Sequence, residues 1–415
     1  MTDRAHAERL DAEDPLAPLR ERFAIDDPET IYLDGNSLGR LPLATRERLG
    51  ELANQWGSEL VGGWHDWIDL PERIGDLLAS GVLGARPSEV IVTDSVTVNL
   101  FKLAGAVLDT RPGAIVTDAE NFPTDRYVLD GLARRHSREL RVFDADPLDG
   151  PQPEDVERAC AGSEVALVSL SHVAYRSGAL ADLAAVNELA RSVGALVLWD
   201  LSHAAGAVPV RLTADGADLA VGCTYKYLNG GPGSPAFLYV RRGLQERLRQ
   251  PVQGWFGQRD QFAMGQEYAP ADRIERYLTG TPPMLSTAAL VPAFDLIEEA
   301  GVDRLRAKGR LLGELTVELA SRWLEPLGFR LASPADPDRR GSHVSLWHPD
   351  AWRICRALAE DAAVICDYRE PDRIRVGPSP AYTRFTDVWD ALDRMRDLVA
   401  NGRHERFPHE KARVT

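Results

Sequence analysis

The sequence predicts an α/β protein with a mostly parallel central sheet and a smaller α+β domain at its C-terminal end. Three observations lead to this prediction. Short, almost continuous apolar runs recur along the middle of the chain, helix-forming stretches separate most of them, and the pattern changes after about residue 300. Strands that are apolar on both faces are typical of a parallel sheet that helices cover on both sides.

The expected elements follow from these runs. Strands are expected at 90–93, 114–117, 141–143, 165–170, 195–199, 219–223 and 236–240, and helices at 97–108, 125–136, 153–161 and 182–193. The smaller domain is expected to contain helices at 302–324, 351–361 and 385–401, and strands at 364–368 and 373–376. The first thirty residues are polar and helix-prone, which indicates an arm or a peripheral helix.

Size and composition agree with this class. The chain has 415 residues, of which 44% are hydrophobic and 27% charged, as in ordinary soluble globular proteins. This length suits one large and one smaller domain. We expect an N-terminal arm and peripheral segment at 1–60, a large domain at 61–295 and a small domain at 296–415.

Charge and composition also exclude several classes of partner. The formal net charge of −15 argues against binding to nucleic acid. The N-terminus lacks the apolar segment of a signal peptide, and no apolar stretch is long enough to span a membrane. The four cysteines show no CxxC spacing, so we expect reduced thiols, a cytoplasmic location and no metal site.

Polar side chains follow several of the expected strands, where ligands bind in parallel sheets. Two of them, Asp200 and Lys226, end successive buried runs. A lysine amine can form a Schiff base with pyridoxal phosphate (PLP), and an aspartate can keep the pyridine nitrogen protonated. Alone, either residue has a simpler explanation, as a turn aspartate or as a lysine lying along apolar neighbours. Their order on consecutive strands favours a PLP site.

Two other motifs are weaker. Residues 35–39 match the G-x-S-x-G pattern of serine hydrolases around Ser37, but only a short apolar pair precedes them and Leu41-Pro42 interrupts the chain before a helix. Residues 144–150 resemble a calcium loop, yet Leu148 stands where an oxygen ligand is required, so we expect a turn. The helix expected after Ser95 could hold a phosphate at its N-terminus.

Four motifs together resemble the kynureninase family, whose members are PLP enzymes of the aspartate-aminotransferase fold. These motifs are DGNSLG at 34–39, FPTD at 122–125, DLSHA at 200–204 and YKYLNGGPG at 225–233. The similarity extends to QGWFG at 253–257, GTPP at 280–283 and RIRVGPSP at 373–380. It therefore runs from about residue 30 to the C-terminus.

The resemblance implies roles for individual residues. Lys226 is expected to form the Schiff base, Asp200 to pair with the pyridine nitrogen, and Tyr225 to contact the phosphate and relay protons. The other implied cofactor contacts are Val96, Thr97, Phe122, Asp125, Ser171 and His203, with Trp255 and Thr281 supplied by the neighbouring subunit of a homodimer. Arg375 is expected to clamp the substrate carboxylate, and Ser37, Trp64 and His65 to line the substrate pocket.

The activity that the resemblance implies is hydrolytic cleavage of the Cβ–Cγ bond of L-kynurenine, giving anthranilate and L-alanine in tryptophan catabolism. Whether 3-hydroxykynurenine is also a substrate stays open. The alternative is another PLP lyase, such as a cysteine desulfurase-like enzyme, which needs a reactive cysteine on a mobile loop. Cys355 and Cys366 fall instead in an expected helix and strand. A PLP-binding regulator would need a DNA-binding module, for which residues 1–30 are too short and too acidic.

Overall fold

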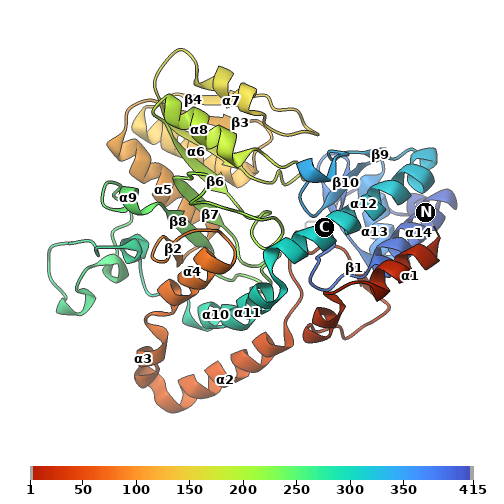
Figure 1. The fold of residues 1–415 in the computed structure, drawn as a ribbon, viewed down its shortest axis with the longest axis horizontal. Helices are drawn as coiled ribbons and strands as arrows, with labels where there is room; N and C mark the ends of the chain where they lie inside the picture. Colours follow the sequence, from red (N-terminus) through yellow and green to blue (C-terminus); the bar gives the residue numbers. More distant parts are fainter. Residues whose placement is uncertain (1–2, 412–415) are drawn as a thin grey trace.

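A seven-stranded sheet forms the centre of the larger part of the molecule in the computed structural model, which describes residues 3–411 (Figure 1). The strand order is β2-β8-β7-β6-β5-β3-β4. The strands are β2 (Val90–Val92), β3 (Ala114–Asp118), β4 (Leu140–Phe143), β5 (Val165–Ser171), β6 (Leu196–Asp200), β7 (Leu219–Gly222) and β8 (Phe237–Val240). Only β8 pairs antiparallel with its neighbours, β2 and β7, so the predicted mostly parallel sheet is confirmed.

Helices cover both faces of this sheet, which is why its strands are apolar throughout. Alternate strand residues enter two separate cores: Leu198 packs in the core that contains residues of α5, whereas its neighbour Trp199 packs in the core that contains residues of α8. The helices of this part are α4 (Leu70–Gly81), α5 (Val96–Thr110), α6 (Pro123–His136), α7 (Pro153–Cys160), α8 (Leu183–Ser192) and α9 (Arg242–Gln245).

The smaller part of the molecule is built on a four-stranded antiparallel sheet with the order β12-β13-β10-β9. Its strands are β9 (Arg330–Leu331), β10 (Val344–Trp347), β12 (Asp367–Arg369) and β13 (Arg373–Val376), and its helices are α12 (Val302–Leu319), α13 (Ala351–Asp361) and α14 (Phe385–Ala400). The helix expected at 302–324 is α-helical as far as Leu319 and continues as a π-helix over Ala320–Leu324.

The single strand expected at 364–368 is wrong. The chain forms two short strands there, because its two halves pair with different partners. β11 (Val364–Ile365) lies parallel to β1 (Ile31–Tyr32) from the N-terminal region, whereas β12 joins β13. An apolar run shows that a segment is extended, but its hydrogen-bonding partners come from distant parts of the chain.

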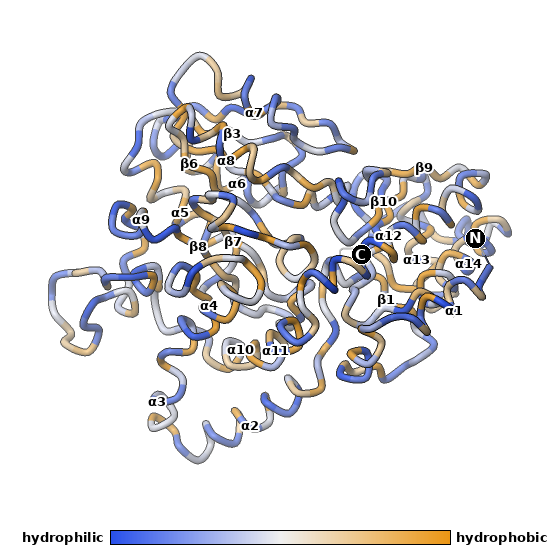
Figure 2. Tube along the Cα trace, viewed as in Figure 1, coloured by the Kyte–Doolittle hydropathy of each residue, from blue (hydrophilic) through white to orange (hydrophobic). Residues whose placement is uncertain are grey.

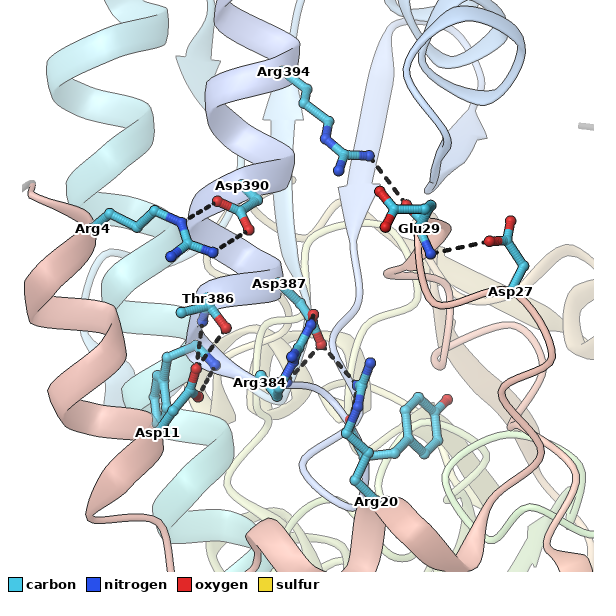
Figure 3. Close-up of polar contacts among 12 residues, drawn as sticks. Arg4, Asp11, Arg20, Asp27, Glu29, Arg384, Thr386, Asp387, Asp390 and Arg394 are labelled. Atoms are coloured by element: carbon cyan, nitrogen blue, oxygen red, sulfur yellow. Dashed lines mark hydrogen bonds and ion pairs between the residues drawn. The ribbon is translucent and has the colours of Figure 1, made fainter.

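The N-terminal helix α1 (Arg4–Ala12) lies along α14, as Figure 1 shows at the right of the molecule. Figure 3 shows the polar contacts: the Arg4 guanidinium binds Asp390 at 2.8 and 3.0 Å, and the Asp11 carboxylate accepts from the first backbone N–H groups of α14. Arg20 reaches Asp387 at 2.8 Å. Helix α1 and Arg20 therefore dock on the C-terminal part of the chain, and the domain boundaries stay our proposal.

The helices α2 (Leu43–Glu59), α3 (Trp64–Trp67), α10 (Met284–Ala288) and α11 (Leu290–Ala300) lie below the larger sheet in Figure 1. Hydrophobic residues recur along α2 in Figure 2, and some of them are exposed, such as Trp56 at 57%. No helix within residues 3–411 is long and apolar enough to cross a membrane.

Candidate cofactor site

A cavity of about 520 Å³ opens where several strands of the larger sheet end. Nine of the residues singled out from the sequence line it: Val96, Thr97, Phe122, Asp125, Ser171, Asp200, His203, Tyr225 and Lys226. Ser171 and Asp200 are the last residues of β5 and β6, and they lie side by side in the parallel pairing. The predicted convergence at the carboxyl ends of the strands is therefore present.

Lys226 follows β7 through a tight turn. The turn is closed by backbone hydrogen bonds from Asn229 N to Lys226 O at 3.0 Å and from Gly230 N to Thr224 O at 2.8 Å. Gly39 of the 34–39 motif packs against its back and donates its N–H to Tyr225 O at 2.8 Å. A Cβ at Gly39 would lie 2.4 Å from Lys226 O, so only glycine allows this approach.

The Lys226 amine contacts a histidine and an aromatic ring. Its Nζ lies 2.9 Å from His203 Nε2 and 6.0 Å from the centroid of the Phe122 ring. Burial, and then the charge of Lys226, lower the pKa of His203 well below its ordinary value. The imidazole is therefore neutral at physiological pH, and its Nε2 can accept a hydrogen bond from the lysine.

Two carboxyl groups, Asp125 and Asp200, face the same cavity. Asp200 accepts from the backbone N–H of Ser202 at 2.8 Å, whereas neither carboxyl oxygen of the fully buried Asp125 has a partner among the described residues. Burial, and then the charge of Asp200, raise the pKa of Asp125 well above its ordinary value. A buried carboxyl group without a partner requires a polar or cationic ligand, and a protonated pyridine ring meets that requirement.

The start of α5 also lines the cavity. Ser95 caps the helix by accepting from Val98 N at 3.4 Å. The N–H groups of the first turn, at Val96 and Thr97, have no acceptor within the helix by its geometry. Such an N-terminus binds phosphate. The cavity thus has a phosphate end, an amine and a pair of carboxyl groups, which fits PLP.

Two residues that the sequence reading missed support this geometry. Asn121 Oδ1 accepts from Ser171 Oγ and from the N–H of Phe122, both at 2.8 Å, and so orients two cavity residues. Tyr175 packs edge-on against Phe122, with ring centroids 5.2 Å apart. The sequence could have indicated Asn121, because it lies between an expected strand and Phe122. No local sequence feature indicated Tyr175.

Arg375 does not line the cavity. Its side chain is 1% exposed, and its Nε donates to Asp367 Oδ1 at 2.7 Å while its Nη1 donates to the Tyr175 carbonyl at 2.7 Å. Its Nη2 contacts Asp367 and also donates to Ser37 Oγ at 3.0 Å. Ser37 thus belongs to a buried ion-pair cluster, and the substrate-binding role of both residues stays a prediction.

The four remaining candidate residues lie outside the cavity. Trp64 and Thr281 line a separate apolar hollow of about 280 Å³ beside α2. His65 is exposed, and Trp255, in the short helical turn Trp255–Gly257, is 40% exposed. A single copy of the chain therefore does not bring these four side chains to Lys226.

Comparisons with known proteins identify relatives of the chain. Residues 305–395 match the model of the kynureninase C-terminal domain. The chain is 43% identical to a kynureninase from Pseudomonas fluorescens and 42% identical to one from Burkholderia pseudomallei, each over 410 residues and 96% of both chains.

Solved structures with the same fold include an apo cysteine desulfurase from Thermococcus onnurineus, with a TM-score of 0.76 and 19% identity over 92% of this chain and 98% of that chain. A C-DES mutant with glycine linked to its PLP has a TM-score of 0.78 and 18% identity, over 89% and 97%. At such identities the likeness shows the fold alone, so the desulfurase alternative is supported only as a structural relative.

Proposed function

The chain belongs to the kynureninase family, and we propose that it uses PLP to hydrolyse the Cβ–Cγ bond of L-kynurenine, giving anthranilate and L-alanine. The observation that carries this proposal is the convergence of Lys226, Asp200, Asp125 and the α5 N-terminus in one cavity. The sequence identity to two kynureninases over almost the whole chain supports the choice of substrate.

When bound, PLP supplies an aldehyde that bonds to amines and a ring that withdraws electrons from the substrate α-carbon. Lys226 would hold the cofactor through its amine, and the same amine would move the α-proton of the substrate. Neutral His203 keeps the lysine amine in place through the 2.9 Å contact. Asp200 and Asp125 hold a proton at the pyridine nitrogen end, which maintains the electron withdrawal.

Tyr225 is the proposed proton donor to the departing alanine fragment. Burial raises the pKa of its phenol above the ordinary value, so the group keeps its proton at physiological pH. A protonated phenol can donate to a carbanion and be reloaded from solvent, which is the role of a general acid.

We propose that Arg375 and Ser37 bind the substrate carboxylate. The Asp367 carboxylate occupies the bidentate face of Arg375, so a substrate carboxylate must share or displace that contact. Trp64 and His65 are proposed to contact the aromatic end of the substrate, and acceptance of 3-hydroxykynurenine is the open question there.

We further propose a homodimer in which Trp255 and Thr281 complete the cavity of the partner subunit. Thr281 lines an apolar hollow together with Trp56 and Leu285, which are exposed by 57% and 43%, and Trp255 is itself 40% exposed. Leu285→Glu is expected to yield monomers in sedimentation and to lower activity. Leu311→Glu, at an equally exposed leucine of α12, should leave the dimer intact; monomeric wild-type protein that is fully active would refute the shared site.

The free thiols support a cytoplasmic location. Cys355 and Cys366 share a thiol hydrogen bond with their sulfur atoms 3.9 Å apart and form no disulfide, which suits a reducing compartment.

The test of the function is to incubate the PLP-loaded protein with L-kynurenine and to measure anthranilate and alanine together. We expect equal amounts of both, formed catalytically. Lys226→Ala should abolish turnover, whereas the exposed Lys411→Ala should not. A PLP-loaded protein that instead releases alanine from L-cysteine would support the desulfurase alternative.

A further inference from the structure

A partly buried ion pair lies next to the turn that forms the phosphate end of the cavity. Lys102, in the second turn of α5, is 0% exposed, and its Nζ lies 2.7 Å from Asp94 Oδ2. The same Nζ donates to the backbone carbonyl of Tyr277 at 2.7 Å. Asp94 lines the cavity immediately before the turn formed by Ser95, Val96 and Thr97. The proposed mechanism uses neither Lys102 nor Asp94.

Asp94 is held in its position from several sides. Its backbone has a φ of 48°, a left-handed conformation that is uncommon for residues other than glycine. Its carboxylate accepts from Thr93 Oγ1 at 3.0 Å and from Thr279 Oγ1 at 3.2 Å. Strained backbone that is fixed by so many contacts occurs mainly at ligand sites, where the geometry must be kept.

The charges of this pair matter because the expected ligand is an anion. A phosphate group on the α5 N-terminus would face the Asp94 carboxylate across the same end of the cavity, and like charges at short range oppose binding. Lys102 is not among the residues that line the cavity, and it forms an ion pair with that carboxylate. Burial lowers the pKa of Lys102, and the charge of Asp94 opposes this shift.

We propose that Lys102 is a positioning residue: it neutralises Asp94 and holds it in place, and thereby lets the turn at 95–97 accept the phosphate group of the cofactor. This inference rests on the proposed function, because it assumes that PLP binds in this cavity. The pair determines the preference for phosphorylated over unphosphorylated pyridoxal.

The test is a charge series measured on apoprotein, by titration with PLP and separately with pyridoxal, followed by the visible absorption of the cofactor. Lys102→Met leaves Asp94 uncompensated and is expected to weaken PLP binding at least about tenfold. Asp94→Asn leaves a positive charge and should bind PLP at least as tightly as wild type. The double variant Asp94→Asn/Lys102→Met is neutral again and should recover most of the PLP affinity that Lys102→Met loses. Pyridoxal affinity should change little in all three.

The matched control is Lys308→Met. Lys308 is also buried and pairs with Asp14 at the same distance, 2.7 Å, but in the smaller part of the molecule away from the cavity. It should destabilise the protein without changing the ratio of PLP to pyridoxal affinity. Circular dichroism identifies any variant that fails to fold. If Lys102→Met is such a variant, the PLP affinity of the neutral double variant still tests the inference.

Three outcomes overturn the inference. The first is an unchanged PLP affinity in folded Lys102→Met, and the second is an equal weakening by both single variants, which indicates packing alone. The third is an equal loss of PLP and pyridoxal binding. Wild-type apoprotein that binds neither compound contradicts the proposed function itself, so the two failures are distinguishable.

Discussion

At the scale of single residues, the site combines carboxyl groups in different environments. Asp200 accepts a backbone hydrogen bond at the end of β6, whereas Asp125 is fully buried and has no partner among the described residues. Burial and the nearby charge of Asp200 together raise the pKa of Asp125. The raised pKa favours the protonated form of Asp125, which can donate a hydrogen bond into the cavity.

Asp200→Ala is predicted to lose most of its turnover while retaining some PLP binding. The alanine cannot keep the ring nitrogen protonated, but the lysine and the helix N-terminus still hold the cofactor. Steady-state kinetics and the visible spectrum of the variant test this. Asp295→Ala, at an exposed position of α11, is the control and should behave as wild type. Undiminished turnover by the Asp200 variant would refute the role of Asp200.

At the scale of elements, the lysine turn is supported by a segment from the far end of the sequence. The 34–39 motif follows β1, and its Gly39 contacts the backbone of the turn that carries Lys226. The motif that matches the pattern of a serine nucleophile therefore supports the lysine turn. Its Ser37 Oγ donates a hydrogen bond to Asp367 Oδ2 at 2.9 Å.

Gly39→Ala is predicted to displace the lysine turn. Its new Cβ would meet Lys226 O at 2.4 Å and Asn229 Oδ1 at 2.3 Å, and overpacking of this kind destabilises by about 1–3 kcal/mol. Turnover should fall together with the urea midpoint. The control is Gly131→Ala on α6, where an added Cβ meets nothing within 4 Å and helix propensity predicts a small gain in stability. A Gly39 variant as stable and active as wild type would contradict the steric argument.

At the scale of the whole molecule, one buried carboxyl group makes the free energy of unfolding depend on pH. Asp118, the last residue of β3, is 3% exposed, and burial raises its pKa to about 7 from an ordinary value of 3.8. Between these values the folded protein binds more protons at this group than the unfolded chain does. The contribution of Asp118 to stability therefore decreases as the pH rises from about 4 to about 7.

Asp118→Asn is predicted to remove this contribution. In the wild-type protein this group makes the free energy of unfolding fall by up to about 1.4 kcal/mol per pH unit across that range. The variant should lack this fall. Urea unfolding at a series of pH values measures it, with the exposed Asp26→Asn as control. Identical pH profiles for Asp118→Asn and wild type would show that the carboxyl group is not protonated in the folded state.

The sequence by itself determined which segments are buried strands and helices, and which polar residues end them. Asp200, Ser171 and Lys226 were identifiable because apolar runs mark strands locally, and because parallel strands place their carboxyl ends together. The helix start at Ser95 was visible for the same local reason.

Only the tertiary structure decided the contacts between segments far apart in the chain. The division of 364–368 into two strands depends on β1, more than 300 residues away, and the bonding of Arg375 to Asp367 depends on strand register. The pairing of Lys102 with Asp94 below the phosphate end was hidden, because a lysine in an apolar helix gives no local sign of its partner. Periodicity records which side of an element is buried, whereas the partner of a buried charge is set by how the elements pack.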